Sequence, residues 1–239
     1  MAINADLHLH SCVSPCGQLE CSPRAVAATA RQRGLQLIAL TDHNTALNCP
    51  AFAEVCSELG LGAVFGIEIT TREEVHALGL FETVEQALEL GERLWRRLPD
   101  IRFNPEKFGD QVYVDADEVI LGEVERFLLT AVELGLEECG ELVQTLGGLF
   151  IPAHIDRTAY SIWSQLGFLP AFPYDGLEIT RPDGPLDTSG YPLLSSSDAH
   201  FLDDIGRRFT VLPGDEPSFS ALAEALRAGS TEPRFTAIA

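Results

Sequence analysis

Asp6-Leu7-His8-Leu9-His10 is the stretch of this 239-residue sequence from which its fold can be worked out. In an extended strand successive side chains point to opposite faces, so Asp6, His8 and His10 would project one way and the two leucines the other. Neutral imidazole binds zinc, iron and manganese well, and a strand fixes the direction of both rings. The pattern alone fits two half-exposed strand histidines equally well, so the remaining four histidines must decide.

The composition is that of a globular protein with an acidic surface. Hydrophobic residues make up 46% and charged residues 22%, and the length suits one domain over residues 1–239. Thirty-six acidic residues against 16 basic ones give a formal net charge of −20, and Lys107 is the single lysine. Nucleic-acid binding depends on basic side chains that neutralise phosphates, so this charge disfavours extended nucleic acid as a partner. A small anion that reaches a local cationic pocket is compatible with it.

The first residues carry no targeting signal of the usual kind. Residues 1–20 lack the basic start and the apolar run of a signal peptide, and no stretch approaches about 18 uninterrupted apolar residues. These features predict a cytoplasmic protein that does not bind a membrane. In that compartment the six cysteines are expected to be free thiols or metal ligands, and without a Cys-x-x-Cys pair a zinc ribbon is disfavoured.

Apolar runs alternate with helical patterns along the chain. Ser22 as N-cap, Pro23 as first helical residue and Gly34 as stop bracket one helix at about 23–33. The other helices are expected at about 50–59, 83–98, 123–134, 137–146 and 218–228, and strands at 35–40, 62–67, 74–80, 148–153, 176–181, 191–195 and 208–212. This alternation predicts the α/β class.

Residues 99–122 interrupt the alternation. Pro99, Pro105 and Gly109 punctuate them, and two short apolar runs flank the acidic turn 115–118, which indicates a hairpin. We interpret the stretch as an inserted hairpin and helical segment. Its acidic turn could bind calcium, but a solvated turn is the favoured interpretation.

All six histidines lie at or just beyond predicted strands, and Glu68 lies at a further strand end. In an α/β barrel the carboxyl ends of the strands meet on one face, where catalytic groups gather. Segments far apart in the sequence would therefore converge. Six unrelated histidines would hardly all avoid the helices.

These residues carry a resemblance to a known family. Asp6–Ser11, Thr41-Asp42-His43, Gly66-Ile67-Glu68, Pro152-Ala153-His154 and Ser197-Asp198-Ala199-His200 resemble the ordered motifs of the PHP (polymerase and histidinol phosphatase) superfamily, from about residue 5 to 208. The resemblance implies a distorted seven-stranded (β/α) barrel, here a single PHP domain with the insertion at about 99–122. It also implies two or three metal ions at one face and hydrolysis of phosphomonoesters or phosphodiesters.

The resemblance implies a ligand set for each ion. The first ion would take His8, His10, Glu68 and Asp198, the second Glu68, His76 and His154, and the third His43 and His200. Nitrogen and oxygen ligands of this kind suit zinc, manganese or iron, and a shared carboxylate can bridge two ions.

Cys16 departs from the family pattern. The family usually has an Asp or His there as a further ligand of the third ion, whereas this chain has Pro15 and Cys16. A thiolate binds zinc or iron, so Cys16 is either a substitute ligand or an inert cysteine beside a weak third site.

Other polar residues are expected to support the centre. Asp42 and Asp6 would orient ligands by hydrogen bonds. Arginine grips phosphate oxygens in pairs, so the candidates for the substrate phosphate are Arg157, Arg181, and Arg207 or Arg208, with surface ion pairing as the alternative for each.

The predicted function is that of a metal-dependent phosphoesterase that hydrolyses a small phosphomonoester with a metal-activated water. Glu68, Asp198 and His200 are expected to carry catalysis, and the leaving group could take its proton from a water, from His200 or from Asp198. The alternatives are a phosphodiesterase or 3'-5' exonuclease on nucleotide ends, and a non-catalytic metal-binding scaffold. The sequence leaves the metal and the oligomeric state open.

Overall fold

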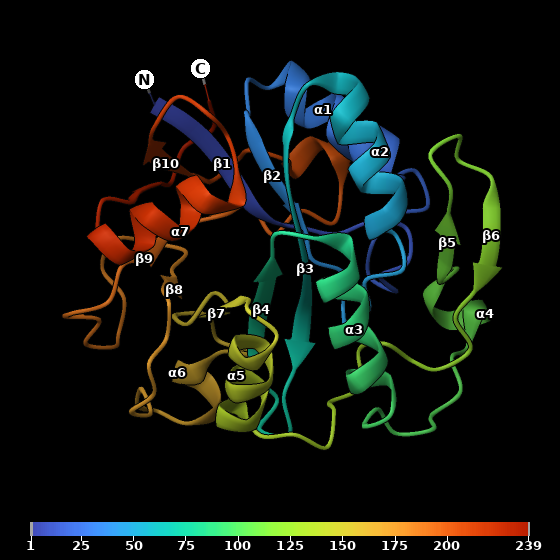
Figure 1. Cartoon of the computed structure of the whole chain (residues 1–239). Helices are drawn as coiled ribbons and strands as arrows, with labels where there is room; N and C mark the ends of the chain where they lie inside the picture. The colour runs from blue at the N-terminus through green and yellow to red at the C-terminus, as the bar shows by residue number, and fades with distance from the viewer. Residues whose placement is uncertain (1, 239) are drawn as a thin grey trace.

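The computed structural model describes residues 2–238, and its centre is a mixed sheet with the strand order β11-β10-β1-β2-β3-β4-β7. These strands are β1 (Ala2–Leu9), β2 (Leu37–Leu40), β3 (Gly62–Thr70), β4 (His76–Phe81), β7 (Leu149–Pro152), β10 (Phe209–Pro213) and β11 (Glu232–Arg234). Strands β1, β2 and β3 are parallel to one another. The pairs β3–β4, β4–β7, β1–β10 and β10–β11 are antiparallel. The sheet is curled (Figure 1), and the predicted α/β class is confirmed.

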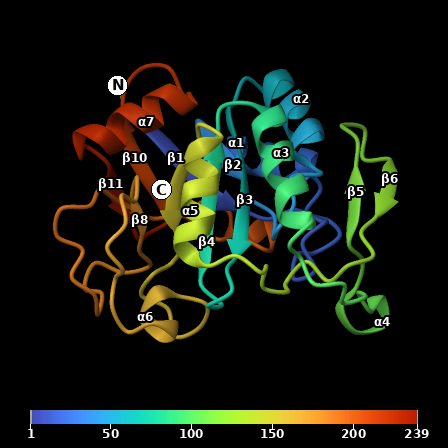
Figure 2. The same ribbon diagram turned by 60° about the horizontal axis from the view of Figure 1, so that its bottom comes forward.

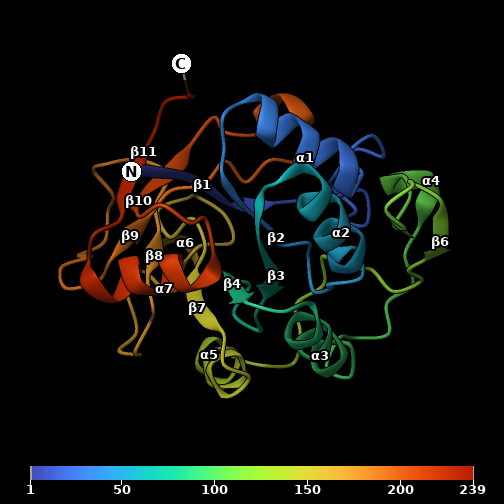
Figure 3. The same cartoon turned by 45° about the horizontal axis from the view of Figure 1, so that its top comes forward.

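The longer helices lie around the outside of this sheet (Figure 3). They are α1 (Pro23–Gln32), α2 (Cys49–Leu59), α3 (Val84–Trp95), α5 (Leu136–Thr145) and α7 (Phe219–Ala228), and the short ones are α4 (Pro105–Phe108), α6 (Ile162–Gln165) and the 3₁₀ turn η1 (Leu202–Asp204). As predicted, Ser22 caps α1 by accepting the backbone N–H of Ala25. Helix α3 ends at Trp95 rather than near Leu98.

Strand β2 shows why the core strands are continuously apolar. Ile38 and Leu40 pack in the cluster that faces α1 and α2, while Leu37 and Ala39 pack in a second cluster with α7. A strand buried on both faces needs apolar side chains at every position. Helix α5 covers β4 (Figure 2), and a Cβ on Gly79 of β4 would come within 2.8 Å of Val143 of α5, so a glycine permits this close approach.

The predicted hairpin is present as β5 (Val112–Val114) and β6 (Ile120–Glu123), which pair with each other and stand apart from the main sheet (Figure 1). Val112 and Val114 pack against Cys12, and the backbone N–H of Val114 donates to the Asn48 side chain. Whether the stretch is an insertion stays a prediction.

The prediction of a helix at about 123–134 is wrong. Val124, Leu128 and Val132 are buried at the four-residue spacing of a helix, but the segment is irregular and extended. Its backbone bonds to other segments, since the N–H of Val124 donates to Gln111 and the N–H of Val132 donates to Thr70. Tertiary contacts therefore replace the local bonds that the apolar spacing predicts.

The late strands are shorter than predicted. Only β8 (Leu177–Glu178) and β9 (Leu193–Leu194) form in the predicted segments 176–181 and 191–195, as a separate parallel pair. The N–H of Ile155, beyond β7, donates to Glu178, and a bridge joins Leu9 to Ala199. These contacts place the pair near both β7 and β1, and closure into a seven-stranded barrel stays a prediction. Across residues 2–238 we find no helix with the length and apolarity needed to span a bilayer.

Candidate metal centre

One edge of the curled sheet gathers the predicted ligands from β1 to β4. His8 and His10 come from the end of β1, His43 follows β2, and Glu68 lies near the end of β3. His76 instead begins β4, which is antiparallel to β3 and pairs His76 with Thr70. The first residue of an antiparallel strand lies beside the last residues of its partner, so His76 reaches the same edge.

The remaining predicted ligands follow β7 and β9. His154, Asp198 and His200 complete the cluster, and His200 is its most exposed imidazole, at 21%. His154 and Asp198 have positive φ values of 31° and 51°, as does Asn44 at 51° directly after His43. Such values are uncommon outside glycine and collect at functional sites, where the surrounding fold holds them.

Glu68 is the centre of the cluster. Its Oε1 lies 3.2 Å from His8 Nε2, 2.8 Å from His76 Nδ1 and 3.1 Å from His154 Nε2, and its Oε2 lies 3.3 Å from His10 Nε2 and 3.1 Å from His43 Nδ1. Burial acts to raise the pKa of Glu68, but the imidazoles of His76, His8 and His43 outweigh it and hold the pKa well below its usual range. The carboxylate is therefore ionised and available as a bridging ligand.

Several of these atoms lack hydrogen-bond partners. Within residues 2–238 no hydrogen bond reaches the buried His8 Nε2, His10 Nε2, His43 Nδ1, Glu68 Oε2 or Asp198 Oδ1, although they approach one another closely. Leaving a buried polar atom unpaired costs about 1–3 kcal/mol, so such a set needs a common partner. Imidazole nitrogens and carboxylate oxygens that face one another fit divalent ions such as zinc, manganese or iron.

Among residues 2–238, three groups of donor atoms lie close enough to hold an ion, and the donor atoms of each group are within 4.8 Å of one another. They are His8, His10, Glu68 and Asp198; His43, Glu68 and His76; and His10, His43 and His200. The first group has the same members as the set expected for the first ion. The second contains His43 where His154 was expected, although His154 also contacts Glu68, and the third adds His10. The assignment of each residue to an ion stays a prediction.

Cys16 lines the same cavity as His43 and His200 but belongs to none of these three groups. The residue is exposed on one side, yet desolvation within the cavity and the charges of Glu68 and Asp198 raise the pKa of its thiol. A metal-free centre therefore holds Cys16 as a thiol, and its role as a ligand stays a prediction.

Glu178 and Ser14 support the imidazoles, and sequence reasoning missed both. Glu178 Oε2 lies 3.0 Å from His8 Nδ1, which leaves His8 Nε2 free to face the cluster. Ser14 Oγ lies 3.1 Å from His10 Nδ1 and accepts the N–H of His43. A carboxylate inside the apolar stretch 176–179 was a signal for Glu178, since a buried charge needs a partner.

Asp42 and Asp6 act less directly than expected. Asp42 accepts hydrogen bonds from the hydroxyls of Ser11 and Ser14, so it reaches His10 and His43 through Ser14. Asp6 accepts the backbone N–H groups of Ser197 and Gly206 and so holds the segment that carries Asp198. Burial raises the pKa of Asp6 to about 6.

Arg157 is the predicted phosphate ligand that lies in the metal cavity. Its side chain is 34% exposed, and its guanidinium pairs with Asp198. Burial acts to lower the pKa of Arg157, but the charges of Asp198 and Glu178 outweigh burial and raise the pKa above its usual value. A fixed positive charge therefore stands beside the carboxylate of the cluster.

The other predicted arginines lie elsewhere. Arg208 and Arg207 donate to the backbone carbonyls of Ser196 and Ser197, which braces the segment before Asp198. Arg181 is 56% exposed, pairs with Asp156 at 3.7 Å and lines a separate cavity of about 240 Å³.

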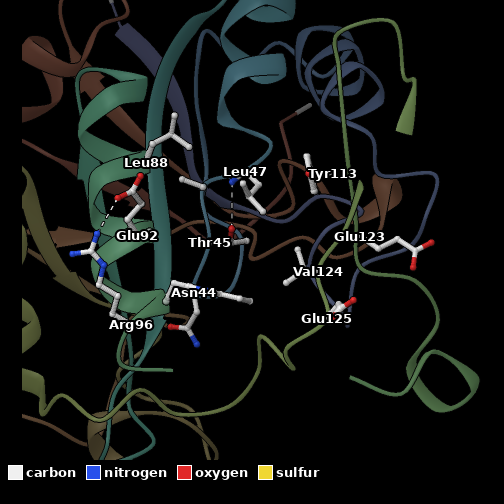
Figure 4. Close-up of a pocket in the computed structure, with 13 residues that line it drawn as sticks. Asn44, Thr45, Leu47, Leu88, Glu92, Arg96, Tyr113, Glu123, Val124 and Glu125 are labelled. Atoms are coloured by element: carbon white, nitrogen blue, oxygen red, sulfur yellow. Dashed lines mark hydrogen bonds and ion pairs between the residues drawn. The ribbon is translucent and has the colours of Figure 1, made fainter. Parts of the chain in front are cut away.

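A second, larger cleft is lined by Asn44, the residue that follows His43. The metal cavity measures about 290 Å³, and a neighbouring cleft of about 680 Å³ lies between α3 and residues 113 and 123–125 (Figure 4). Asn44 lines the cleft, and its amide donates to the carbonyls of Leu128 and Thr130. Glu92 and Arg96 on the wall of the cleft pair with each other, so they satisfy one another without a ligand.

A mixed α/β fold with imidazoles and carboxylates gathered at one sheet edge is the arrangement of a metal-dependent hydrolase. The model of the PHP domain family matches residues 6–155, more than half of the chain, and a PHP-associated model matches residues 186–231. The chain therefore belongs to the PHP family, as the sequence predicts.

Relatives with solved structures share the fold at low sequence identity. The lesion-specific endonuclease PfuEndoQ of Pyrococcus furiosus superposes with a TM-score of 0.73 and 21% identity over 98% of this chain and 58% of its own. Endonuclease Q bound to a 27-mer duplex with an abasic lesion superposes with a TM-score of 0.72 and 20% identity. The match covers 95% of this chain and 57% of that one. A candidate metal-dependent phosphoesterase of Bifidobacterium adolescentis superposes with a TM-score of 0.59 and 19% identity. The match covers 93% of this chain and 95% of that one.

By sequence, an uncharacterized protein of Methanocaldococcus jannaschii is 32% identical over 96 residues, which are 36% of this chain and 56% of that protein. The match thus covers a little over half the length of the Methanocaldococcus jannaschii protein and of each of the two endonuclease chains.

The predicted partner is wrong. The net charge of −20 predicts a small phosphorylated substrate and no extended nucleic acid, whereas a protein that shares this fold holds duplex DNA at its active site. The charge argument fails because it sums over the whole surface, while a nucleic acid contacts one face and divalent ions add positive charge there.

Proposed function

We propose that this chain hydrolyses phosphodiester bonds of nucleic acid with the help of two or three divalent ions held by the cluster around Glu68. The observation that carries the proposal is the convergence of five imidazoles on one ionised, buried carboxylate. The ions, when bound, supply Lewis acidity toward phosphoryl oxygens and lower the pKa of water.

The protein's own groups have distinct roles in this proposal. Glu68 and Asp198 hold the ions, and Arg157 binds a phosphoryl oxygen of the substrate through its exposed guanidinium face. His200 faces the cavity, and burial together with the charge of His10 lowers its pKa to about 4. His200 is therefore neutral at pH 7, and its ring can accept a hydrogen bond from the reacting groups.

The fold also supports the finer architecture that the resemblance implies. The hydrogen bond from Ile155, after β7, to Glu178 of β8 and the bridge between Leu9 of β1 and Ala199, after β9, support a distorted seven-stranded barrel. We propose one PHP domain over residues 1–239 with the hairpin β5–β6 as an insertion.

The test is a substrate panel with a matched variant. Wild-type protein loaded with zinc, manganese or iron should hydrolyse bis(4-nitrophenyl) phosphate, single-stranded DNA or a duplex with an abasic site faster than 4-nitrophenyl phosphate. Glu68→Ala should lower the rate at least about 100-fold, while Glu216→Gln, at an exposed position, should leave it unchanged. Metal-loaded protein that cleaves monoesters alone would contradict the diester proposal.

A further inference from the structure

Tyr160 is a cavity residue with no role in the scheme above. It follows β7 in the same loop as Arg157, lines the metal cavity and is 47% exposed. Its φ of +53° lies in the left-handed region, which a large aromatic residue rarely adopts. The fold holds this residue in an unfavourable backbone conformation beside the ligands.

Tyr160 contacts His76 twice. Its carbonyl accepts the backbone N–H of His76 at 2.9 Å. Its ring stacks on the imidazole with the centroids 4.7 Å apart and the planes 19° from parallel. The backbone contact fixes where β4 begins, and the ring contact fixes the plane of the imidazole.

Within residues 2–238, His76 lacks the second hydrogen bond that orients the rings of His8 and His10. His8 and His10 are oriented through their second ring nitrogens, by Glu178 and Ser14. His76 Nδ1 faces Glu68 at 2.8 Å, and no side chain among residues 2–238 hydrogen-bonds its Nε2. The Tyr160 ring takes the place of the missing hydrogen-bond partner.

We propose that Tyr160 is a positioning residue of the metal centre, whose ring holds the His76 imidazole in the orientation that directs Nδ1 to the ion shared with Glu68. The inference rests on the proposed metal-binding role of His76. Stacking alone carries it, because the phenolic oxygen of Tyr160 makes no hydrogen bond within the described part of the chain. Tyr160→Phe should therefore behave as wild type.

The test is titration of metal-free protein with Co²⁺, followed by visible absorption and by elemental analysis. Tyr160→Gly removes the ring and suits the positive φ, so the variant is expected to fold. One of its Co²⁺ ions should bind at least about tenfold less tightly than in wild type, with an altered spectrum. Tyr160→Leu, which keeps bulk without a flat ring, should show the same loss.

Glu74→Gly is the matched control. Glu74 also has a positive φ, of 57°, and lies in the turn before β4, so it tests backbone relaxation without ring loss. Its Co²⁺ spectrum and affinity should equal those of wild type. Unchanged Co²⁺ affinity and spectrum in both Tyr160→Gly and Tyr160→Leu would overturn the inference. A wild-type protein that takes up no Co²⁺ would instead overturn the proposed metal centre itself.

Discussion

His8 Nδ1 lies 3.0 Å from Glu178 Oε2, and the same oxygen accepts the backbone N–H of His154 at 2.9 Å. One buried carboxylate thus orients an imidazole on the first strand and the backbone beyond β7. Burial acts to raise the pKa of Glu178, but the charge of His8 and its hydrogen bond lower it, so the group is ionised. We expect metal binding to depend on this residue, although it belongs to none of the three groups that can hold an ion.

Removing the Glu178 carboxylate should weaken metal binding. Glu178→Gln keeps the size but leaves His8 without an anionic acceptor, and changes of this kind typically cost about 10–100-fold in affinity. Zinc affinity measured by competition with a chelator should fall by that factor, while the exposed variant Glu216→Gln should not change. Equal affinities in both variants would show that Glu178 has no part in ligand orientation.

Cys16→Ser decides the role of the cysteine that lines the metal cavity. If Cys16 binds the third ion, the variant should retain about one ion fewer per chain, because a serine hydroxyl is a poor ligand for zinc or iron. Elemental analysis after dialysis gives the count, and Cys56→Ser, in a buried position away from the cavity, is the control. An unchanged number of ions per chain would show that Cys16 is not a metal ligand.

Arg157→Ala should impair substrate binding without affecting the ions. A hydrogen bond to a charged group contributes about 1.5–3 kcal/mol, so kcat/KM for a phosphodiester should fall roughly 10–150-fold. Arg181→Ala, at an arginine outside the metal cavity, should leave kcat/KM unchanged. Loss of metal from Arg157→Ala would instead mean that the guanidinium stabilises Asp198 as a ligand.

Metal binding should release protons. Burial acts to lower the pKa of His10, but the carboxylates of Asp198 and Glu68, each 3.3 Å from its Nε2, outweigh it and raise the pKa to about 9. Below pH 9 the metal-free His10 is protonated, and a ligand must be neutral, so affinity should rise as the pH increases toward 9. Calorimetry in two buffers with different ionisation enthalpies should give different heats at pH 7.5. Identical heats would contradict a protonated His10.

The sequence predicted the site better than its surroundings. Strand ends can be recognised from apolar runs, so the convergence of His8, Glu68 and His154 followed from strand positions and from family motifs. Contacts made across the fold leave no local trace. The apolar spacing of Val124, Leu128 and Val132 looks helical because nothing in that segment shows that its backbone bonds elsewhere. The stacking of Tyr160 on His76 likewise depends on two loops that only the tertiary structure brings together.

The length of the turn between β3 and β4 limits which insertions and deletions this chain can accept. Residues 71–75 connect Thr70 to His76, and the pairing of those two residues sets which side chains of β4 face Glu68. Side chains alternate along a strand, so inserting or deleting one residue in this turn would turn His76 away and present an apolar neighbour in its place. Loop lengths usually drift freely between related proteins, but here the length of a short connection is itself a determinant of metal chemistry.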